Sequence, residues 1–237
     1  MQVDVVLFGA HPDDVEWGAG GIALLLQRQN IPFVVVDLTS GEMGSRGTPE
    51  GRAVEAGKAA EFLGAVAREN LAMPDGSLAD SPDARKQIAA VIRCYRPKLV
   101  LAPYWEDRHP DHAAAGLTVR NSSLYCALRK SGDPNPPHKP AAFLYYLLHN
   151  FDRPSLVVDI STVYESKLEL LRLHESQFSK TAEEFGVVPL GLGDYLFGLE
   201  SRDRFFGSLI GTRHGEALVA DQPLKLSSVS QVLSLAP

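Results

Sequence analysis

Cysteine is scarce in this chain, with Cys94 and Cys126 the only two among 237 residues. They form no Cys-x-x-Cys pair, and two thiols cannot build the disulfide framework of a small secreted protein. We interpret both as unpaired thiols within helices. This usage suits a reducing compartment, so a cytoplasmic protein is expected.

Long apolar runs and concentrated positive charge are also missing. No apolar stretch reaches the roughly 18 residues of a membrane-spanning helix, and the N-terminus does not have the pattern of a secretory signal. The formal net charge is −6. Nucleic acid and anionic membranes need a concentrated basic face on their partner, so neither is expected to bind.

Short runs rich in β-branched residues alternate with stretches of helical periodicity, in a chain that is 45% hydrophobic. Strands are expected at 3–8, 33–38, 66–71, 98–102, 143–148 and 156–160. Helices are expected at 18–29, 48–63, 81–96, 113–128, 161–174 and 194–206. The proline-rich connection at 131–140 should lie at the surface, where it could act as a lid.

This alternation predicts right-handed crossovers and a mostly parallel sheet flanked by helices. The fold class is therefore α/β, a Rossmann-like single domain spanning residues 1–237. The pattern predicts no structure for the tail at 226–237.

Two clusters rich in histidine and aspartate follow the first and fourth expected strands. They are His11-Pro12-Asp13-Asp14 and His109-Pro110-Asp111-His112. In doubly wound sheets these two strands usually lie side by side where the strand order reverses, and ligands bind beyond their carboxyl ends. We therefore expect both clusters in one crevice.

The residue types in the two clusters are those of a catalytic zinc site, which takes three protein ligands and leaves one position for water. His11, one of the two aspartates and His112 can supply the ligands, and the other aspartate can act as general base. Spacing alone does not decide between Asp13 and Asp14. His109 can face the same site, and Asp111 could orient an imidazole.

The residues around both clusters resemble the PIG-L/LmbE family of zinc-dependent sugar N-deacetylases. Within that family, the chain is most similar to the bacillithiol-biosynthesis branch, which deacetylates N-acetylglucosaminyl malate. The matching residues are Gly9-Ala10, Gly18-Ala19-Gly20-Gly21, Leu38-Thr39, Gly41-Glu42, Arg46-Gly47-Thr48-Pro49-Glu50, Arg52, Asn70-Leu71, Pro74-Asp75-Gly76, Glu106-Asp107-Arg108, Glu175-Ser176-Gln177-Phe178 and Phe206-Gly207-Ser208-Leu209-Ile210-Gly211.

The resemblance implies an LmbE-like fold and a role for each site residue. It implies that His11, Asp14 and His112 are the zinc ligands. It makes Asp13 the general base. It makes His109, oriented by Asp111, the charged partner of the tetrahedral intermediate and the proton donor, and it places Tyr195 at the developing oxyanion. It also implies that Arg52 binds substrate and that the protein is a homo-oligomer, a trimer or hexamer.

Several specific expectations accompany this assignment. Arg46 and Arg108 are the other arginines near the expected site, and guanidinium groups would suit the two carboxylates of malate. Another GlcNAc substrate, such as a chitin oligosaccharide, is the alternative. Iron could replace zinc in cells. His214 stands where close relatives tend to have tyrosine, which bears on the fine substrate preference.

Three other classes of protein share parts of this pattern. Gly9-Ala10-His11 lacks the second glycine of the dinucleotide fingerprint, which argues against cofactor-dependent redox chemistry. Two histidines and a carboxylate also occur in non-haem iron oxygenases, but the spare aspartate favours hydrolysis. A non-catalytic sugar-binding protein with a structural metal is the third alternative, and a metal closed by a fourth protein ligand would indicate it.

Overall fold

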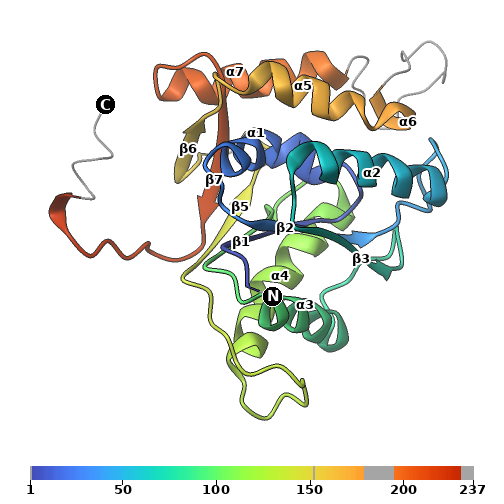
Figure 1. Ribbon diagram of the computed structural model, residues 1–237, viewed down its shortest axis with the longest axis vertical. Helices are drawn as coiled ribbons and strands as arrows, with labels where there is room; N and C mark the ends of the chain where they lie inside the picture. Colours follow the sequence, from blue (N-terminus) through green and yellow to red (C-terminus); the bar gives the residue numbers. More distant parts are fainter. Residues whose placement is uncertain (1, 152, 179–194, 231–237) are drawn as a thin grey trace.

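All the described strands lie in one sheet in the order β3-β2-β1-β4-β5-β7-β6 (Figure 1). The computed structural model describes residues 2–151, 153–178 and 195–230. The first five strands are parallel, and β7 runs antiparallel to both its neighbours. The strands are β1 (Val5–Gly9), β2 (Phe33–Thr39), β3 (Ala67–Met73), β4 (Leu99–Pro103), β5 (Ala142–Tyr146), β6 (Leu156–Asp159) and β7 (Gly215–Ala220). The α/β class expected from the sequence is confirmed.

Helices cover both faces of the sheet, as Figure 1 shows. One face carries α3 (Pro82–Tyr95) and α4 (Pro110–Ala127), and the other carries α1 (Asp14–Arg28), α2 (Pro49–Leu63), α5 (Tyr164–Arg172) and α7 (Tyr195–Leu209). The short α6 (Glu175–Phe178) follows α5. Among the described residues, no helix has both the length and the apolar character needed to cross a membrane.

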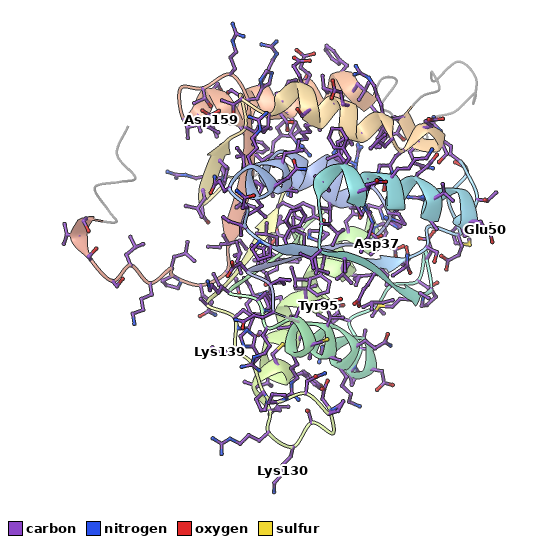
Figure 2. All side chains as sticks on the ribbon, viewed as in Figure 1. Asp37, Glu50, Tyr95, Lys130, Lys139 and Asp159 are labelled. Atoms are coloured by element: carbon purple, nitrogen blue, oxygen red, sulfur yellow. The ribbon has the colours of Figure 1, made fainter. Side chains whose placement is uncertain are left out.

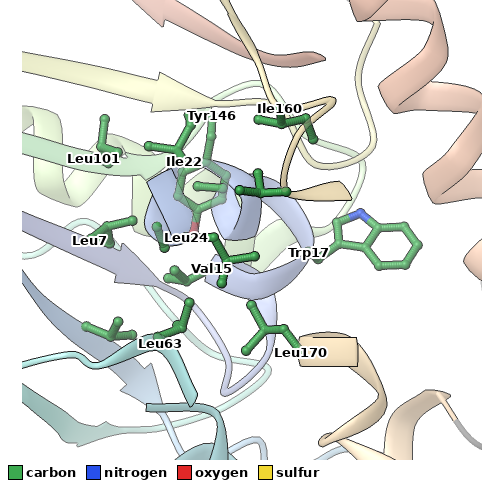
Figure 3. Close-up of a cluster of buried hydrophobic side chains, with 14 of the residues drawn as sticks. Leu7, Val15, Trp17, Ile22, Leu24, Leu63, Leu101, Tyr146, Ile160 and Leu170 are labelled. Carbon is green, nitrogen blue, oxygen red and sulfur yellow. The ribbon is translucent and has the colours of Figure 1, made fainter. Parts of the chain in front are cut away.

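Each face of the sheet has its own apolar core, because successive side chains of a strand point to opposite faces. In β1, Leu7 belongs to the core beneath α1, whereas Val6 and Phe8 belong to the core beneath α3 and α4. Figure 3 shows the first of these cores, with Trp17 of α1 at its margin. The strands are consequently held between two buried layers.

The helix starts expected from the sequence are confirmed at α2 and α3. The hydroxyl of Thr48 accepts a hydrogen bond from the N–H of Gly51, and that of Ser81 from the N–H of Ala84, each at 3.1 Å. These N-caps satisfy backbone donors that a helix leaves without partners in its first turn. α2 ends at Gly64 in the left-handed conformation (φ 63°), which glycine adopts without strain.

Each histidine cluster leads directly into a helix, because the turn at residues 11–13 precedes α1 and His109 is the N-cap of α4. α1 begins at Asp14, not at residue 18, and α4 begins at Pro110, not at residue 113. Asp13 is the N-cap of α1, but its side chain makes no capping hydrogen bond, and its backbone has φ 151°, a conformation that non-glycine residues rarely adopt. The metal-ligand candidates are therefore attached directly to helices.

The connection at 131–140 cannot act as a lid over the clusters, and that expectation is wrong. It follows the C-terminal end of α4 and returns at Ala141, whose N–H donates to the carbonyl of Lys98 just before β4. This places it at the amino ends of the strands, away from the clusters. Lys130 and Lys139 mark the loop in Figure 2.

The seventh strand of the sheet, β7, was not predicted from the sequence. It enters the sheet antiparallel between β5 and β6, so its neighbours come from an earlier part of the chain. Of the tail at 226–237, residues 231–237 lie outside the described residues.

The glycines at 18–21 permit close packing of α1. A Cβ on Gly18 would lie 2.2 Å from the ring of Tyr146, and a Cβ on Gly21 would lie 2.6 Å from Ile160. Both distances are too short for non-bonded carbon atoms. The glycines thus have a packing role in this helix, which accounts for them without a bound nucleotide.

The helical backbone of α1 is interrupted at Ala19 (φ −140°, ψ 19°), and buried charged side chains make hydrogen bonds to the backbone on both sides of this residue. The carboxylate of Glu216 accepts the N–H groups of Gly21 and Ile22 at 2.8 and 2.7 Å, and Arg202 donates to the carbonyl of Trp17 at 2.6 Å. These contacts satisfy backbone groups freed by the interruption. The first turns of α1, which carry Asp14 and Trp17, can therefore run in a different direction from the rest of the helix.

Lys167 neutralises this buried cluster, because its ammonium lies 2.7 Å from both Asp203 and Glu216. We expect Lys167→Met to lower the free energy of unfolding by about 3–5 kcal/mol, since it leaves the buried carboxylate of Glu216 without its cation, whereas Asp203 keeps its ion pair with Arg202. Denaturant unfolding measures this. Lys86→Met, at a side chain that is 55% exposed, is the control and should change stability by no more than about 0.5 kcal/mol. Equal effects of the two substitutions would contradict the prediction.

Candidate active site

The two histidine clusters meet at the carboxyl ends of β1 and β4, which are paired in register from Val5 with Leu99 to Leu7 with Leu101. The ring centroid of His11 lies 5.3 Å from that of His112 and 5.0 Å from that of His109. The expected shared crevice is confirmed. It results from the strand order, because β1 and β4 are adjacent at the reversal point of the sheet.

His11, Asp14 and His112 present ligand atoms that lie within 4.8 Å of one another. The Asp14 carboxylate is 3.5 Å from His11 Nδ1 and 3.2 Å from His112 Nε2. The nitrogens on the far sides of both rings face other carboxylates: His11 Nε2 is 3.0 Å from Asp75, and His112 Nδ1 is 3.3 Å from Asp107. Carboxylates behind histidine ligands are typical of zinc sites, where they fix the ring orientation.

The electrostatics of this group favour a cation. Burial alone would lower the pKa of both imidazoles, but the surrounding carboxylates, Asp14 and Asp111 for His11 and Asp14 and Asp107 for His112, raise these pKa values to about 12 and about 9. Protons on the rings would balance the carboxylates, and a divalent metal ion can take their place. Two imidazoles and a carboxylate with an open side therefore fit a catalytic metal ion.

Asp13 stands next to this group without belonging to it. Its carboxylate is 3.2 Å from the guanidinium of Arg52, which also donates to the carbonyls of Pro12 and Gly41. Burial raises the pKa of Asp13, and Arg52 opposes that rise. Arg52 thereby holds both the side chain and the unusual backbone of the turn.

His109 also faces the crevice. Its Nδ1 accepts the backbone N–H of Asp111 at 3.2 Å, so a neutral ring carries its proton on Nε2. Burial lowers the pKa of His109 to about 4, with the neighbouring His112 contributing.

Asp111 orients His109 through its backbone, whereas its carboxylate makes hydrogen bonds elsewhere. That carboxylate accepts the N–H groups of Gly76 and Leu78 and lies 3.4 Å from His11 Nε2. The family resemblance implies an action of Asp111 on His109, in its own cluster. The first turn of α4 instead directs the carboxylate across the crevice to His11.

A cavity of about 440 Å³ opens beside the ligand group. Its aromatic wall consists of Trp17, Phe178 and Tyr195. The Trp17 and Phe178 rings are stacked 5.7 Å apart, and Tyr195 lies 6.2 Å from Trp17. Further lining residues are His11, Asp13, Asp14, Met43, Gly44, Ser45, Arg46, Arg52, Asp75, Gly76, His109, His112, Leu148, His149 and Gln177.

The three arginines expected to bind substrate have different surroundings. Arg52 is buried against Asp13, and Arg46 donates to the carbonyl of Gln177 at 2.9 Å while its guanidinium lies 5.5 Å from the centre of the Tyr195 ring. Arg108 is exposed and does not line the cavity as described. Thus two of the three reach the cavity, and both make contacts within the protein there.

Sequence reasoning assigned no role to Asp75, Asp107 or His149. The first two lie in motifs quoted for the family resemblance, but nothing local connects them to His11 and His112. His149 follows β5, and its position after a parallel strand was the available signal, because the carboxyl ends of such strands share an edge.

Comparisons with known proteins show the family to which the chain belongs. Residues 6–123 match the family PIG-L, GlcNAc-PI de-N-acetylase. The chain is 34% identical to diacetylchitobiose deacetylase of Thermococcus kodakarensis over 90% of its own length and 81% of the relative's. It is 29% identical to a probable N-acetyl-α-D-glucosaminyl L-malate deacetylase 2 of Bacillus cereus, covering 78% and 88% of the two chains. The crystal structure of a conserved protein from Thermus thermophilus superposes with a TM-score of 0.84 and 33% identity, covering 95% and 97%.

Fold and relatives together define a deacetylase that acts on N-acetyl amide bonds. The chain belongs to the PIG-L family. Deacetylases of this family depend on a metal ion, and the His/Asp group described above is able to bind one.

Proposed function

We propose that the protein is a zinc-dependent hydrolase that removes the N-acetyl group from a GlcNAc unit of a short chitin oligosaccharide such as diacetylchitobiose. The observation that carries this proposal is the arrangement of His11, Asp14 and His112 beside Asp13 and His109 on one cavity. The products would be acetate and the free amine.

The residues around the metal position suit hydrolysis of an amide. Zinc held by His11, Asp14 and His112 would lower the pKa of a bound water to roughly 7 and polarise the acetyl carbonyl. Asp13, beside this position, would accept the proton of the attacking water.

The Nε2–H of the neutral His109 ring would donate a hydrogen bond to the carbonyl oxygen, and the proton that Asp13 takes from the water would pass to the leaving nitrogen, so that the amine departs neutral. The Tyr195 hydroxyl, on the aromatic wall, would add a hydrogen bond to the developing oxyanion.

Two observations support a neutral sugar next to the reacting GlcNAc. Arg46 and Arg52 already make hydrogen bonds within the protein, so a dicarboxylate would have to compete for them. The aromatic wall formed by Trp17, Phe178 and Tyr195 carries no charge of its own, and apolar and aromatic surfaces with a few polar groups are typical of small-molecule sites.

N-acetylglucosaminyl malate is the second candidate. The motif resemblance to the bacillithiol branch favours it, as does the Bacillus cereus relative. In that case Arg46 would have to leave Gln177 to meet a malate carboxylate, or Arg108 would have to turn toward the cavity.

Acetate release measured with diacetylchitobiose, GlcNAc and N-acetylglucosaminyl malate, alongside metal analysis of the same sample, tests the proposal. We expect kcat/KM for diacetylchitobiose to exceed that for the malate glycoside at least about tenfold, the factor that corresponds to about 1.4 kcal/mol. Chelation should abolish activity, and zinc should restore it. A higher kcat/KM for the malate glycoside would select the second candidate, and restoration by ferrous iron alone would reject zinc.

A further inference from the structure

His149 lines the cavity from a side to which the mechanism above assigns no residue. It follows β5, whose carboxyl end lies beside that of β4 because the two strands are paired along their length. We propose that His149 is a specificity-determining residue that accepts a hydrogen bond from a hydroxyl group of the sugar being deacetylated. This inference rests on the proposed function and adds a contact to it.

The backbone at His149 is held on both sides. The carbonyls of Leu147 and Leu148 accept hydrogen bonds from the buried guanidinium of Arg202 at 3.1 and 3.3 Å. The N–H of His149 donates to Asp107 at 3.1 Å. A side chain attached here is pre-organised, so a ligand contact would cost little conformational entropy.

The hydrogen bonds of the ring leave one nitrogen for a ligand. Nδ1 is 3.1 Å from Asp107 Oδ1, and since an ionised carboxylate can only accept, Nδ1 carries the proton of a neutral ring. Nε2 is then a hydrogen-bond acceptor, and a sugar hydroxyl can donate to it.

The position of the ring places this acceptor close to the reacting group. The ring is parallel to that of His112, with centroids 5.2 Å apart and an interplanar angle of 6°. Its side chain is 12% exposed, at the cavity wall. A sugar whose acetamide reaches the metal position would therefore bring its ring hydroxyls to this wall.

The contacts of Asp107 suggest two alternative roles for His149. The same carboxylate oxygen that meets His149 lies 3.3 Å from His112 Nδ1. His149 could therefore act only through Asp107, by fixing the orientation of His112. In addition, Asp107, His112 and His149 present ligand atoms within 4.8 Å of one another, which could hold a second ion.

Three substitutions separate these roles. In His149→Asn, the amide N–H can replace Nδ1–H toward Asp107, but nothing replaces Nε2. In His149→Gln, the longer amide can place its oxygen near the position of Nε2. His149→Ala removes both groups.

We expect His149→Asn and His149→Ala to raise KM for diacetylchitobiose to a similar extent, about three- to tenfold, as the loss of one hydrogen bond predicts. His149→Gln should recover part of the loss. The value of kcat and the zinc content should stay close to wild type in all three variants. If His149 acted only through Asp107, His149→Ala would change the kinetics, whereas His149→Asn, which keeps the contact with Asp107, would not.

Wild-type KM in His149→Asn would overturn the inference, because the Asp107 contact alone would then explain the residue. Loss of a second equivalent of zinc in His149→Asn would overturn it in favour of a second metal site. A wild-type enzyme that releases no acetate from any of the three sugars would reject the proposed function itself, and this inference with it. Acetate release by the wild type together with unchanged variants would reject the His149 contact only.

Discussion

Asp14→Ala is expected to remove both metal and activity. The Asp14 carboxylate lies between the ring nitrogens of His11 and His112 and completes the three-ligand group that would hold a water-bearing zinc. Without it, a water of pKa about 15.7 replaces one of roughly 7, so turnover should fall at least about a thousandfold. Metal analysis after gel filtration and an acetate assay measure the two effects.

Asp14→Asn is the matched variant, because one Asp14 oxygen also accepts the N–H groups of Ala10 and His11, each at 2.9 Å. The asparagine oxygen can keep those two contacts while the charge is lost. Metal loss in both variants, with Asp14→Asn still folded by circular dichroism, would attribute the effect to coordination. Near-stoichiometric zinc in Asp14→Ala would remove Asp14 from the ligand set.

Asp13→Asn is expected to keep the metal and lose at least about a hundredfold in kcat, the lower range for general-base catalysis. Asp13 lies beside the ligand group, and its carboxylate faces Arg52 at 3.2 Å. The amide oxygen of the substitute can still accept from Arg52, so the turn should hold its shape. Zinc content and steady-state kinetics on one preparation test both parts of the prediction.

Asp83→Asn provides the control for Asp13→Asn, since the Asp83 side chain is 86% exposed in the first turn of α3. It should leave both zinc and kcat unchanged. An Asp13→Asn enzyme with the wild-type rate would disprove the base assignment. Loss of zinc in that variant would instead place Asp13 among the ligands, the alternative that the spacing of the cluster left open.

These two predictions concern residues that sequence patterns could find. The helix starts at Thr48 and Ser81 depend on contacts between near neighbours in the chain, so the sequence predicts them directly. The parallel sheet follows from the alternation of strands and helices. The meeting of the two clusters follows in turn from the reversal of strand order between β1 and β4.

Tertiary structure alone decided which distant groups support the site. His11 meets Asp75 across 64 residues of sequence, and His149 meets Asp107 across 42. Three further features were also decided by tertiary structure: the insertion of β7, the buried contacts of Arg52 and the orientation of the Asp111 carboxylate toward His11. Each depends on where strands and helix starts end up in three dimensions. Periodicity and capping signals contain no such information, because they describe only neighbours along the chain.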